Sequence, residues 1–421
     1  MGDGLYEHIF NRIEELRDYA VRMLMDVIER QGVNPEYGGE GEYDKAMYIL
    51  ETVRSWGLND VKIIYSQDPR AKNGVRPNVL VFIRGESDEK FWIVSHLDVV
   101  PPGDVSAWTV TKPFEPRVVE GKVYGRGAED NGQAIVSSLI AAKSLLDCGI
   151  KPRRTIVLAF VSDEEAGSRH GMELLVNNYP ELFSRKDVAL VPDFGKSDGG
   201  FIEIAEKSIL WLKVRFIGVQ VHASIPNKGF NPHRIAIEYL HMVNIMVNTR
   251  FSSMDSLFDP PHTTCEPTMV RNTAGSPNIV PREHEVVIDC RILPEYSVDM
   301  VLNSFIEIAE YMKKIFYREI EGKHYPEIEI EVVNRLDAPP PTPRDSPIVT
   351  TLIHALRRLR NIDPVVGGIG GGTLAAYFRR LGIPAVVWAT HDNTAHMPNE
   401  YSRIHNIVED AKIMAYLMMS L

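Results

Sequence analysis

The sequence predicts an α/β protein in which a central, mostly parallel sheet is flanked by helices and interrupted by an inserted α+β unit. Short apolar runs alternate with helical patterns near both ends of the chain, as in a sheet covered by helices. Residues 208–337 break this alternation, and the proline cluster at 339–343 then provides a stiff, extended return. We therefore expect one domain in two pieces, 1–207 and 338–421, around an inserted domain, 208–337.

The first piece opens with helices. Between residues 5 and 30 apolar side chains recur every three or four positions, which predicts an amphipathic helix, and a second helix is expected at 42–56. The segment 155–161, TIVLAFV, shows no polar alternation, so we expect a strand buried on both faces. Similar patterns predict a helix at 133–146 and further strands at 79–83, 91–94, 188–191 and 385–388.

The inserted domain has a different order of elements. It begins with a strand near 210–216 and continues with a long helix from about residue 232. Strands near 268 and at 285–291, a helix at 298–316 and a strand at 328–333 complete it. Two helices and about four strands predict a separate α+β unit.

Composition excludes several classes of protein. The 421 residues include 46 Lys+Arg against 57 Asp+Glu, a formal charge of −11, which argues against a nucleic-acid or anionic-membrane partner. The sequence contains no run of about 18 apolar residues, so we expect no membrane span. Its first residues do not show the basic start and apolar segment of a secretory signal peptide. The sequence has three cysteines that lie far apart, Cys148, Cys265 and Cys290. Their number and spacing predict no disulfide framework, which fits a reducing compartment. We expect a cytoplasmic protein.

Acidic and imidazole side chains follow the predicted strands. Because ligands bind beyond the carboxyl ends of strands in open α/β sheets, these residues are candidates for one site. An acid at any one of these places alone is ordinarily a solvated loop residue, but five separate segments that each carry such side chains favour a shared role. The candidates are His96, Asp98, Glu164, Glu165 and Asp193 after strands, Asp130 after a tight turn, and His396 after the last strand.

The chemistry of this set is metal binding. Imidazole and carboxylates without thiolate suit zinc first, with cobalt or manganese as alternatives. Carboxylates packed this closely repel one another unless cations lie between them. Two divalent ions sharing one carboxylate and one water would offset the charge and provide a hydroxide nucleophile, with one carboxylate left as general base.

Motifs along most of the chain strengthen this interpretation. The chain resembles the M20 family of metallopeptidases and amidohydrolases, in particular its branch of acetylornithine deacetylases and succinyl-diaminopimelate desuccinylases. The resemblance rests on these blocks, which follow the family's order: HLDVVPPGD at 96–104, YGRGAED at 124–130, SDEE at 162–165, VHASIP at 221–226, NIVP at 278–281, DCRILP at 289–294, GGT at 371–373 and AHMPNE at 395–400.

The resemblance implies a role for each candidate. His96 and Asp193 would hold one ion, Glu165 and His396 the other, and Asp130 would bridge both ahead of a cis peptide bond to Asn131. Asp98 would hydrogen-bond His96 and fix its tautomer. Glu164 would take a proton from the bridging water and pass it to the leaving amine.

The resemblance also implies roles for the inserted domain, as a lid through which the chain forms a homodimer. His222 would reach the partner's active site and stabilise the oxyanion, and Asn278 would donate a hydrogen bond nearby. Arg291 would bind a substrate carboxylate, although a salt bridge inside the lid is the alternative. Gly371, Gly372 and Thr373 would let the backbone approach the substrate.

Three positions depart from the family's usual pattern. Asn131-Gly132-Gln133 replaces Met-Lys-Gly, and Leu374 stands where Asp is common. Asp193 is the residue of family dipeptidases, whereas deacylases have Glu there. We expect a hydrolase of N-acyl amino acids; the alternatives are a dipeptidase or carboxypeptidase with the same machinery and, more remotely, a catalytically silent member that serves in binding or assembly.

Overall fold

The computed structural model describes residues 3–421 and divides the chain into two compact units. Unit 1 contains the described chain up to Ile204 together with Thr342–Val366 and Thr373–Leu421. Unit 2 contains Ala205–Pro341 and the short segment Gly367–Gly372. The chain therefore crosses between the units at four places.

Unit 1 is built on an eight-stranded sheet with the order β1-β2-β6-β3-β7-β18-β8-β17. The expected strands at 79–83, 91–94, 155–161, 188–191 and 385–388 are all present, as parts of β2, β3, β6, β7 and β18. The sheet strands are β1 Val61–Gln67, β2 Val75–Ile83, β3 Ser87–His96, β6 Arg154–Val161, β7 Val188–Lys196, β8 Phe201–Glu206, β17 Val365–Ile369 and β18 Ala385–Thr390.

The sheet is mixed, which corrects the expectation of a mostly parallel one. Strands β6, β3, β7 and β18 are parallel neighbours at its centre. The pairs β1–β2, β2–β6 and β18–β8 are antiparallel. Apolar runs reveal that a segment is a strand, but they do not reveal its direction when the partner lies far away in sequence. The parallel centre is the part that positions the site.

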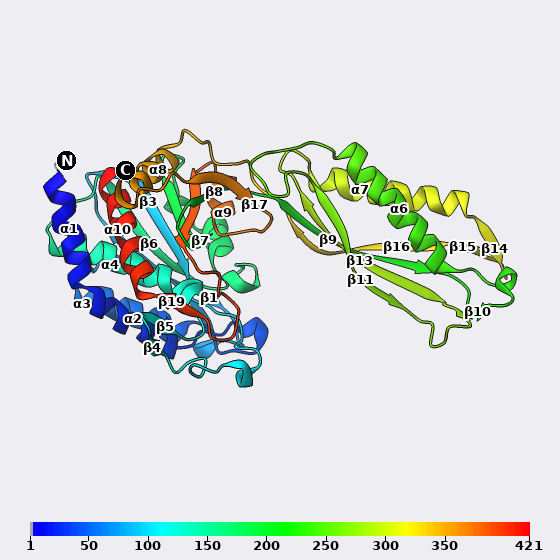
Figure 1. Ribbon diagram of the computed structural model, residues 1–421, viewed down its shortest axis with the longest axis horizontal. Coiled ribbons are helices and arrows are strands. Elements are labelled where there is room, and N and C mark those ends of the chain that lie inside the picture. Colours follow the sequence, from blue (N-terminus) through cyan, green and yellow to red (C-terminus); the bar gives the residue numbers. More distant parts are fainter. Residues whose placement is uncertain (1–2) are drawn as a thin grey trace. The chain divides into compact units, whose positions relative to one another are not determined.

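Helices cover both faces of this sheet (Figure 1). Helices α4 and α10 pack against each other on one face, and α5 and α9 pack on the other. The helix expected over residues 5–30 is in fact two, because Leu16 leaves helical geometry between α1 and α2. The helices of unit 1 are α1 Asp3–Glu15, α2 Arg17–Glu29, α3 Tyr43–Ser55, α4 Ala134–Asp147, α5 Met172–Asn178, α8 Pro347–Arg360, α9 Ala375–Arg380 and α10 Ile404–Ser420. No helix of residues 3–421 is long and apolar enough to cross a membrane.

The central strands are apolar on both faces. In β6 every residue after Arg154 is buried, as expected for TIVLAFV. On the face of α5 and α9, Trp92 stacks on Phe183, and Phe378 packs against both rings. A sheet buried on both sides holds its strand ends rigidly, which suits a site built there. A separate small sheet consists of β4 Arg117–Val119, β5 Lys122–Tyr124 and β19 Tyr401–Arg403.

Unit 2 is an antiparallel sheet with the order β11-β13-β9-β16, covered on one face by two helices (Figure 1). Burial alternates residue by residue along β13, so one face of the sheet packs on α6 and α7 and the other is open. Its elements are β9 Ser208–Ile217, β10 Val221–His222, α6 Pro232–Arg250, β11 Thr264–Asn272, β12 Ile279–Val280, β13 Glu283–Ile292, α7 Val298–Ile315, β14 Arg318–Ile320, β15 Lys323–Tyr325 and β16 Glu327–Leu336.

The structure corrects the expectation about cysteines. Cys265 of β11 and Cys290 of β13 lie directly opposite each other in the strand register and form a disulfide. Their 25-residue separation hides this pairing, because only the register of the two strands brings them together. Cys148 is free. The argument for a reducing compartment from unpaired cysteines therefore loses its basis.

Candidate active site

The carboxyl ends of the parallel strands bring the predicted ligands together in unit 1. His96 is the last residue of β3, and Glu164 and Glu165 follow β6, its neighbour on one side. Asp193 belongs to β7, the neighbour on the other side, and His396 follows β18. Adjacent strand ends thus place residues that are up to 300 positions apart in sequence at one edge of the sheet.

The sequence suggested that Asp193 lies beyond the end of a strand, but the structure places it inside strand β7. Strand β7 continues to Lys196, and its register with β18 shifts between Val387 and Ala389. Such an irregularity turns a side chain out of the regular alternation. The side chain of Asn131 donates to Asp193 Oδ1 at 2.6 Å and to the carbonyl of Pro192 at 3.3 Å. Asn131, which departs from the family's usual pattern, therefore helps to hold the predicted ligand Asp193 in position.

Asp130 is shared between two groups of potential metal ligands. Its Oδ1 lies 2.8 Å from His96 Nε2, which is 3.3 Å from Asp193 Oδ1. Its Oδ2 lies 3.0 Å from His396 Nε2, which is 3.2 Å from Glu165 Oε1. We name these groups cluster 1 (His96, Asp130, Asp193) and cluster 2 (Asp130, Glu165, His396). The Asp130–Asn131 peptide bond is cis.

The donor set fits two divalent ions. Two atoms bound tetrahedrally to zinc, each about 2.1 Å from it, lie about 3.4 Å apart, close to the distances within both clusters. Burial and then the charge of Asp130 raise the pKa of Glu165 to about 7. Hydrogen bonds to Asp130 and then Glu165 raise the pKa of His396 to about 10. The carboxylates of the two clusters lie close together, so protons or cations must offset their negative charge.

Asp98 contacts the far nitrogen of His96 and also the loop that follows β6. The nearest acceptor for His96 Nδ1 is the backbone carbonyl of Asp98 at 3.0 Å, while its carboxylate is 3.5 Å away. A bond from Nδ1 leaves Nε2 free for a metal. The Asp98 carboxylate accepts the backbone N–H groups of Glu164 and Glu165, both at 3.0 Å, and Asn34 Nδ2 at 2.8 Å. It therefore fixes the loop that follows β6.

Glu164 belongs to neither ligand cluster. Burial, and next the negative charge of Asp193, raise the pKa of Glu164 well above the usual range for glutamate. A carboxylate beside two metal-ligand groups, but outside them, is placed for proton transfer.

A buried ionic network lies behind this loop, and sequence reasoning missed it. Arg76 of β2 is fully buried and pairs with both carboxylate oxygens of Glu42 and, at 2.6 Å, with Asp163 Oδ1. Asn34 donates to Asp163 Oδ1 at 3.1 Å as well as to Asp98. Asp163 has a positive φ of 69°, which these contacts stabilise. The signal in the sequence was an arginine near the start of a mostly apolar strand.

The predicted residues of unit 2 form two separate groups. His222 of β10 is exposed; its Nδ1 contacts Ser224 Oγ at 2.7 Å, and its Nε2 lies 3.4 Å from Asn278 Nδ2. Arg291 forms a two-pronged ion pair with Asp289 and donates to the carbonyl of Gly370 at 2.6 Å. The alternative of a salt bridge within unit 2 is thus present, and a substrate carboxylate would have to replace Asp289.

The glycine-rich segment divides between the units. Gly371 has open space where a Cβ would stand, whereas at Gly372 a Cβ would lie 2.4 Å from Leu336. Thr373 begins the return to unit 1, where its Oγ1 accepts the N–H of Ala375 at the start of α9. Leu374 is buried in the core beside Phe378, which explains an apolar residue at that position. Substrate contacts of Gly371, Gly372 and Thr373 stay a prediction.

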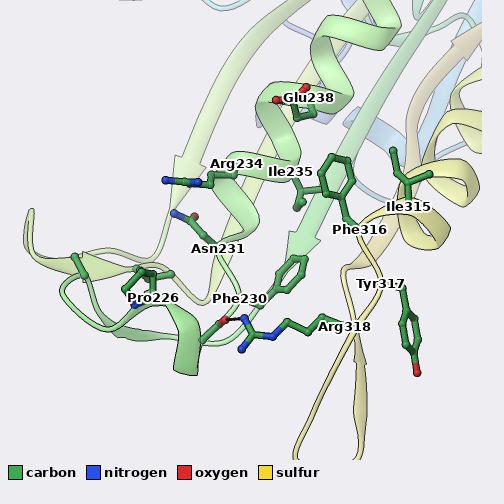
Figure 2. A pocket seen from close by; sticks show the side chains of 13 residues that line it. Pro226, Phe230, Asn231, Arg234, Ile235, Glu238, Ile315, Phe316, Tyr317 and Arg318 are labelled. Atoms are coloured by element: carbon green, nitrogen blue, oxygen red, sulfur yellow. Dashed lines mark hydrogen bonds between the residues drawn. The ribbon is translucent and has the colours of Figure 1, made fainter.

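A pocket of about 750 Å³ lies in unit 2 (Figure 2). Phe230, Ile235 and Phe316 line it together with polar groups such as Arg234 and Glu238. Its lining also includes neighbours of His222 and Ile279, but none of the predicted ligands. The pocket and the two metal-ligand clusters are therefore different features of the molecule.

The chain is similar to known proteins over most of its length. Residues 92–420 match the family described as Peptidase family M20/M25/M40. An uncharacterised metallohydrolase of Methanocaldococcus jannaschii is 38% identical over 95% of this chain and 98% of its own. A succinyl-diaminopimelate desuccinylase of Rickettsia bellii is 24% identical over 91% of this chain and 92% of its own.

Solved structures share the fold. An aminopeptidase PepT of Bacillus cereus has a TM-score of 0.72 and 17% identity, covering 96% of this chain and 98% of its own. A dinuclear metal-binding peptidase of Bacillus subtilis has a TM-score of 0.65 and 16% identity, covering 96% and 98%. The predicted α/β fold with an additional domain is confirmed, and so is the family resemblance. The chain belongs to peptidase family M20/M25/M40 and is a metal-dependent hydrolase.

Proposed function

We propose that the protein hydrolyses the linear amide bond of N-acyl amino acids, using two divalent ions, of which zinc suits the ligands first and cobalt or manganese second. The observation that carries the proposal is the position of Asp130, whose two carboxylate oxygens face two different histidine–carboxylate clusters. A single carboxylate shared in this way is the arrangement that a two-ion site requires.

The residues of this chain have distinct tasks in that reaction. Bound divalent ions polarise the scissile carbonyl and lower the pKa of water at the site. Glu164 accepts the proton of the attacking water on its carboxylate and delivers it to the leaving nitrogen, a task that suits its raised pKa. Asp98 keeps Glu164 in place through the backbone N–H that it accepts.

Two observations bear on the substrate. The 24% identical relative is named as a desuccinylase, which supports an N-acyl amino acid as substrate. Asp193 is the residue that the resemblance associates with dipeptidases, and it supports a dipeptidase or carboxypeptidase as the second candidate. Both candidates use the same ligands and the same Glu164.

A hydrolysis panel on zinc-reconstituted enzyme tests the proposal. The panel contains succinyl-diaminopimelate, acetylornithine, other N-acyl amino acids, and dipeptides with free or blocked termini. We expect release of the free amine from at least one N-acyl amino acid, measured by a fluorogenic amine reagent. Chelation should abolish turnover and zinc should restore it, because the proposed reaction depends on the bound ions.

The panel separates the candidates. Turnover of dipeptides with no turnover of N-acyl amino acids would replace the first substrate class by the second. Amide hydrolysis that survives complete metal removal would contradict the two-ion mechanism.

We also propose that unit 2 acts as the lid and dimerisation domain and that His222 completes the partner's active site. His222 is exposed on the β10–β12 pair, and Asn278 lies beside its ring, so both can reach a second copy. The imidazole would stabilise the developing oxyanion.

Mixing two inactive variants tests this arrangement. Removing one oxyanion donor by His222→Ala is expected to lower turnover by about 10²–10³-fold. An equimolar mixture of His222→Ala and Glu164→Gln should regain about a quarter of the wild-type activity, because about half of the dimers are mixed and one of the two sites in each mixed dimer has both groups. Sedimentation checks that both variants remain dimers. No recovery in dimers that exchange subunits would contradict the trans role.

A further inference from the structure

The ligands of cluster 2 come from irregular backbone. Asp130 follows a tight turn ahead of α4, and His396 belongs to the loop between β18 and β19. That loop contains three residues with side chains and positive φ: Asn393 at 61°, His396 at 64° and Asn399 at 58°. Such conformations persist only where surrounding contacts hold them. The loop therefore needs support that its own secondary structure does not provide.

Glu129, the neighbour of Asp130, provides that support. Its Oε1 accepts the backbone N–H of Asp392 at 2.6 Å. Its Oε2 accepts the backbone N–H and the hydroxyl of Thr394, and the N–H of Ala395 at 3.0 Å. Glu129 is only 2% exposed. Four bonds thus connect its carboxylate to the residues that immediately precede His396.

Glu400 makes the reciprocal connection. It follows His396 by four residues and is fully buried. Its Oε1 accepts the backbone N–H groups of Glu129 and Asp130 at 3.0 and 3.1 Å. Its Oε2 accepts the N–H of Gly127 at 3.1 Å and Arg126 Nη1 at 2.5 Å. Each loop is therefore held by a carboxylate that belongs to the other.

A general need to satisfy buried backbone groups does not account for this pattern. A buried carboxylate carries a large desolvation cost, so neutral acceptors or water serve that purpose more cheaply. Here two buried carboxylates contact the residues adjacent to the two ligands that meet at 3.0 Å, His396 Nε2 and Asp130 Oδ2. The bonds converge on the relative position of these two ligands.

We propose that Glu129 and Glu400 form a reciprocal brace that preorganises cluster 2 for its ion, with Glu129 as the positioning residue for His396. The inference rests on the two-ion site of the proposed function and adds to it two residues that bind no metal. Contacts of this kind commonly change metal affinity by about 10–100-fold.

Zinc titration of the Glu129→Gln variant tests the brace. Glutamine keeps the size of the side chain but replaces one acceptor oxygen by a donor that faces backbone N–H groups. We expect one ion to bind as in wild type and the second to bind about 10–100-fold more weakly, measured by equilibrium dialysis and elemental analysis. The effect should disappear in a His396→Ala background, because Glu129 acts through His396.

Glu203→Gln is the matched control. Glu203 is also fully buried in unit 1, and its carboxylate pairs with Arg379 at 2.9 Å. This variant should unfold at lower temperature and still bind two ions. Weakening of the second ion to the same degree in both variants would attribute the effect to general destabilisation and overturn the brace.

A measurement on the wild-type protein covers the case in which Glu129→Gln does not fold. In metal-free enzyme, hydrogen exchange at the amides of Thr394 and Ala395 should be slow, because Glu129 already accepts both. Rapid exchange there, or unchanged affinity for the second ion in Glu129→Gln, would overturn the brace and leave the hydrolase proposal standing. A wild-type protein that binds fewer than two zinc ions would instead overturn the proposed function.

Discussion

Replacing Glu164 with glutamine is expected to lower turnover by about 10²–10⁴-fold while both metal ions stay bound. Glutamine has the size of glutamate but cannot accept a proton from water. Glu164 lies outside clusters 1 and 2, so the substitution removes no expected metal ligand. The backbone N–H that Asp98 accepts is unchanged by the substitution, and the loop should keep its conformation.

The measurement combines turnover on the best substrate of the panel with metal content and thermal unfolding. Glu165→Gln is the matched control, because the adjacent residue belongs to cluster 2 and its variant should weaken one ion. A Glu164→Gln enzyme that retains turnover within tenfold of wild type would refute the role of Glu164 as general base.

Replacing Arg76 with alanine is expected to destabilise unit 1 by about 3–5 kcal/mol. Arg76 is fully buried, and its removal would leave the carboxylates of Glu42 and Asp163 without their cation. An uncompensated buried charge costs far more than a lost surface ion pair. The same variant should also lower turnover, because Asp163 precedes Glu164 in the loop.

Urea unfolding followed by circular dichroism measures the first effect. Arg76→Met separates charge from volume, since methionine fills much of the space but supplies no cation. Arg84→Ala is the surface control: Arg84 pairs with Asp60, both side chains are largely exposed, and we expect a change within about 0.5 kcal/mol. Equal stability of Arg76→Ala and wild type would show that the network contributes nothing net.

The sequence predicted that these side chains would lie together, because the candidate ligands follow apolar strands. The runs that end at His96 and before Glu164 are recognisable as strands, and parallel strands end at one edge of a sheet. The resemblance of AHMPNE at 395–400 to the family's motif then pointed to His396 as a candidate. All five expected ligands lie in the two clusters.

Features that depend on distant register were beyond the sequence. Cys265 and Cys290 pair only because β11 and β13 align at those positions. The carboxylate of Asp98 accepts hydrogen bonds from the backbone N–H groups of Glu164 and Glu165, since the loop after β6 passes beside it. Neither contact has a periodic or local signal, because each is set by how two remote segments are aligned.

The four crossings between the units have a practical consequence for anyone dividing the protein into fragments. Residues 205–341 are contiguous, yet they are not a complete module. They rely on contacts with the separate segment Gly367–Gly372. In that segment the carbonyl of Ile369 accepts the N–H of Lys207, and the carbonyl of Gly370 accepts a hydrogen bond from the Arg291 side chain. Gly368 of the same segment lies against the ring of Phe258. A clone of the insert alone would lack these partners, so a circular permutant or co-expressed pieces would preserve unit 2 where simple excision would not.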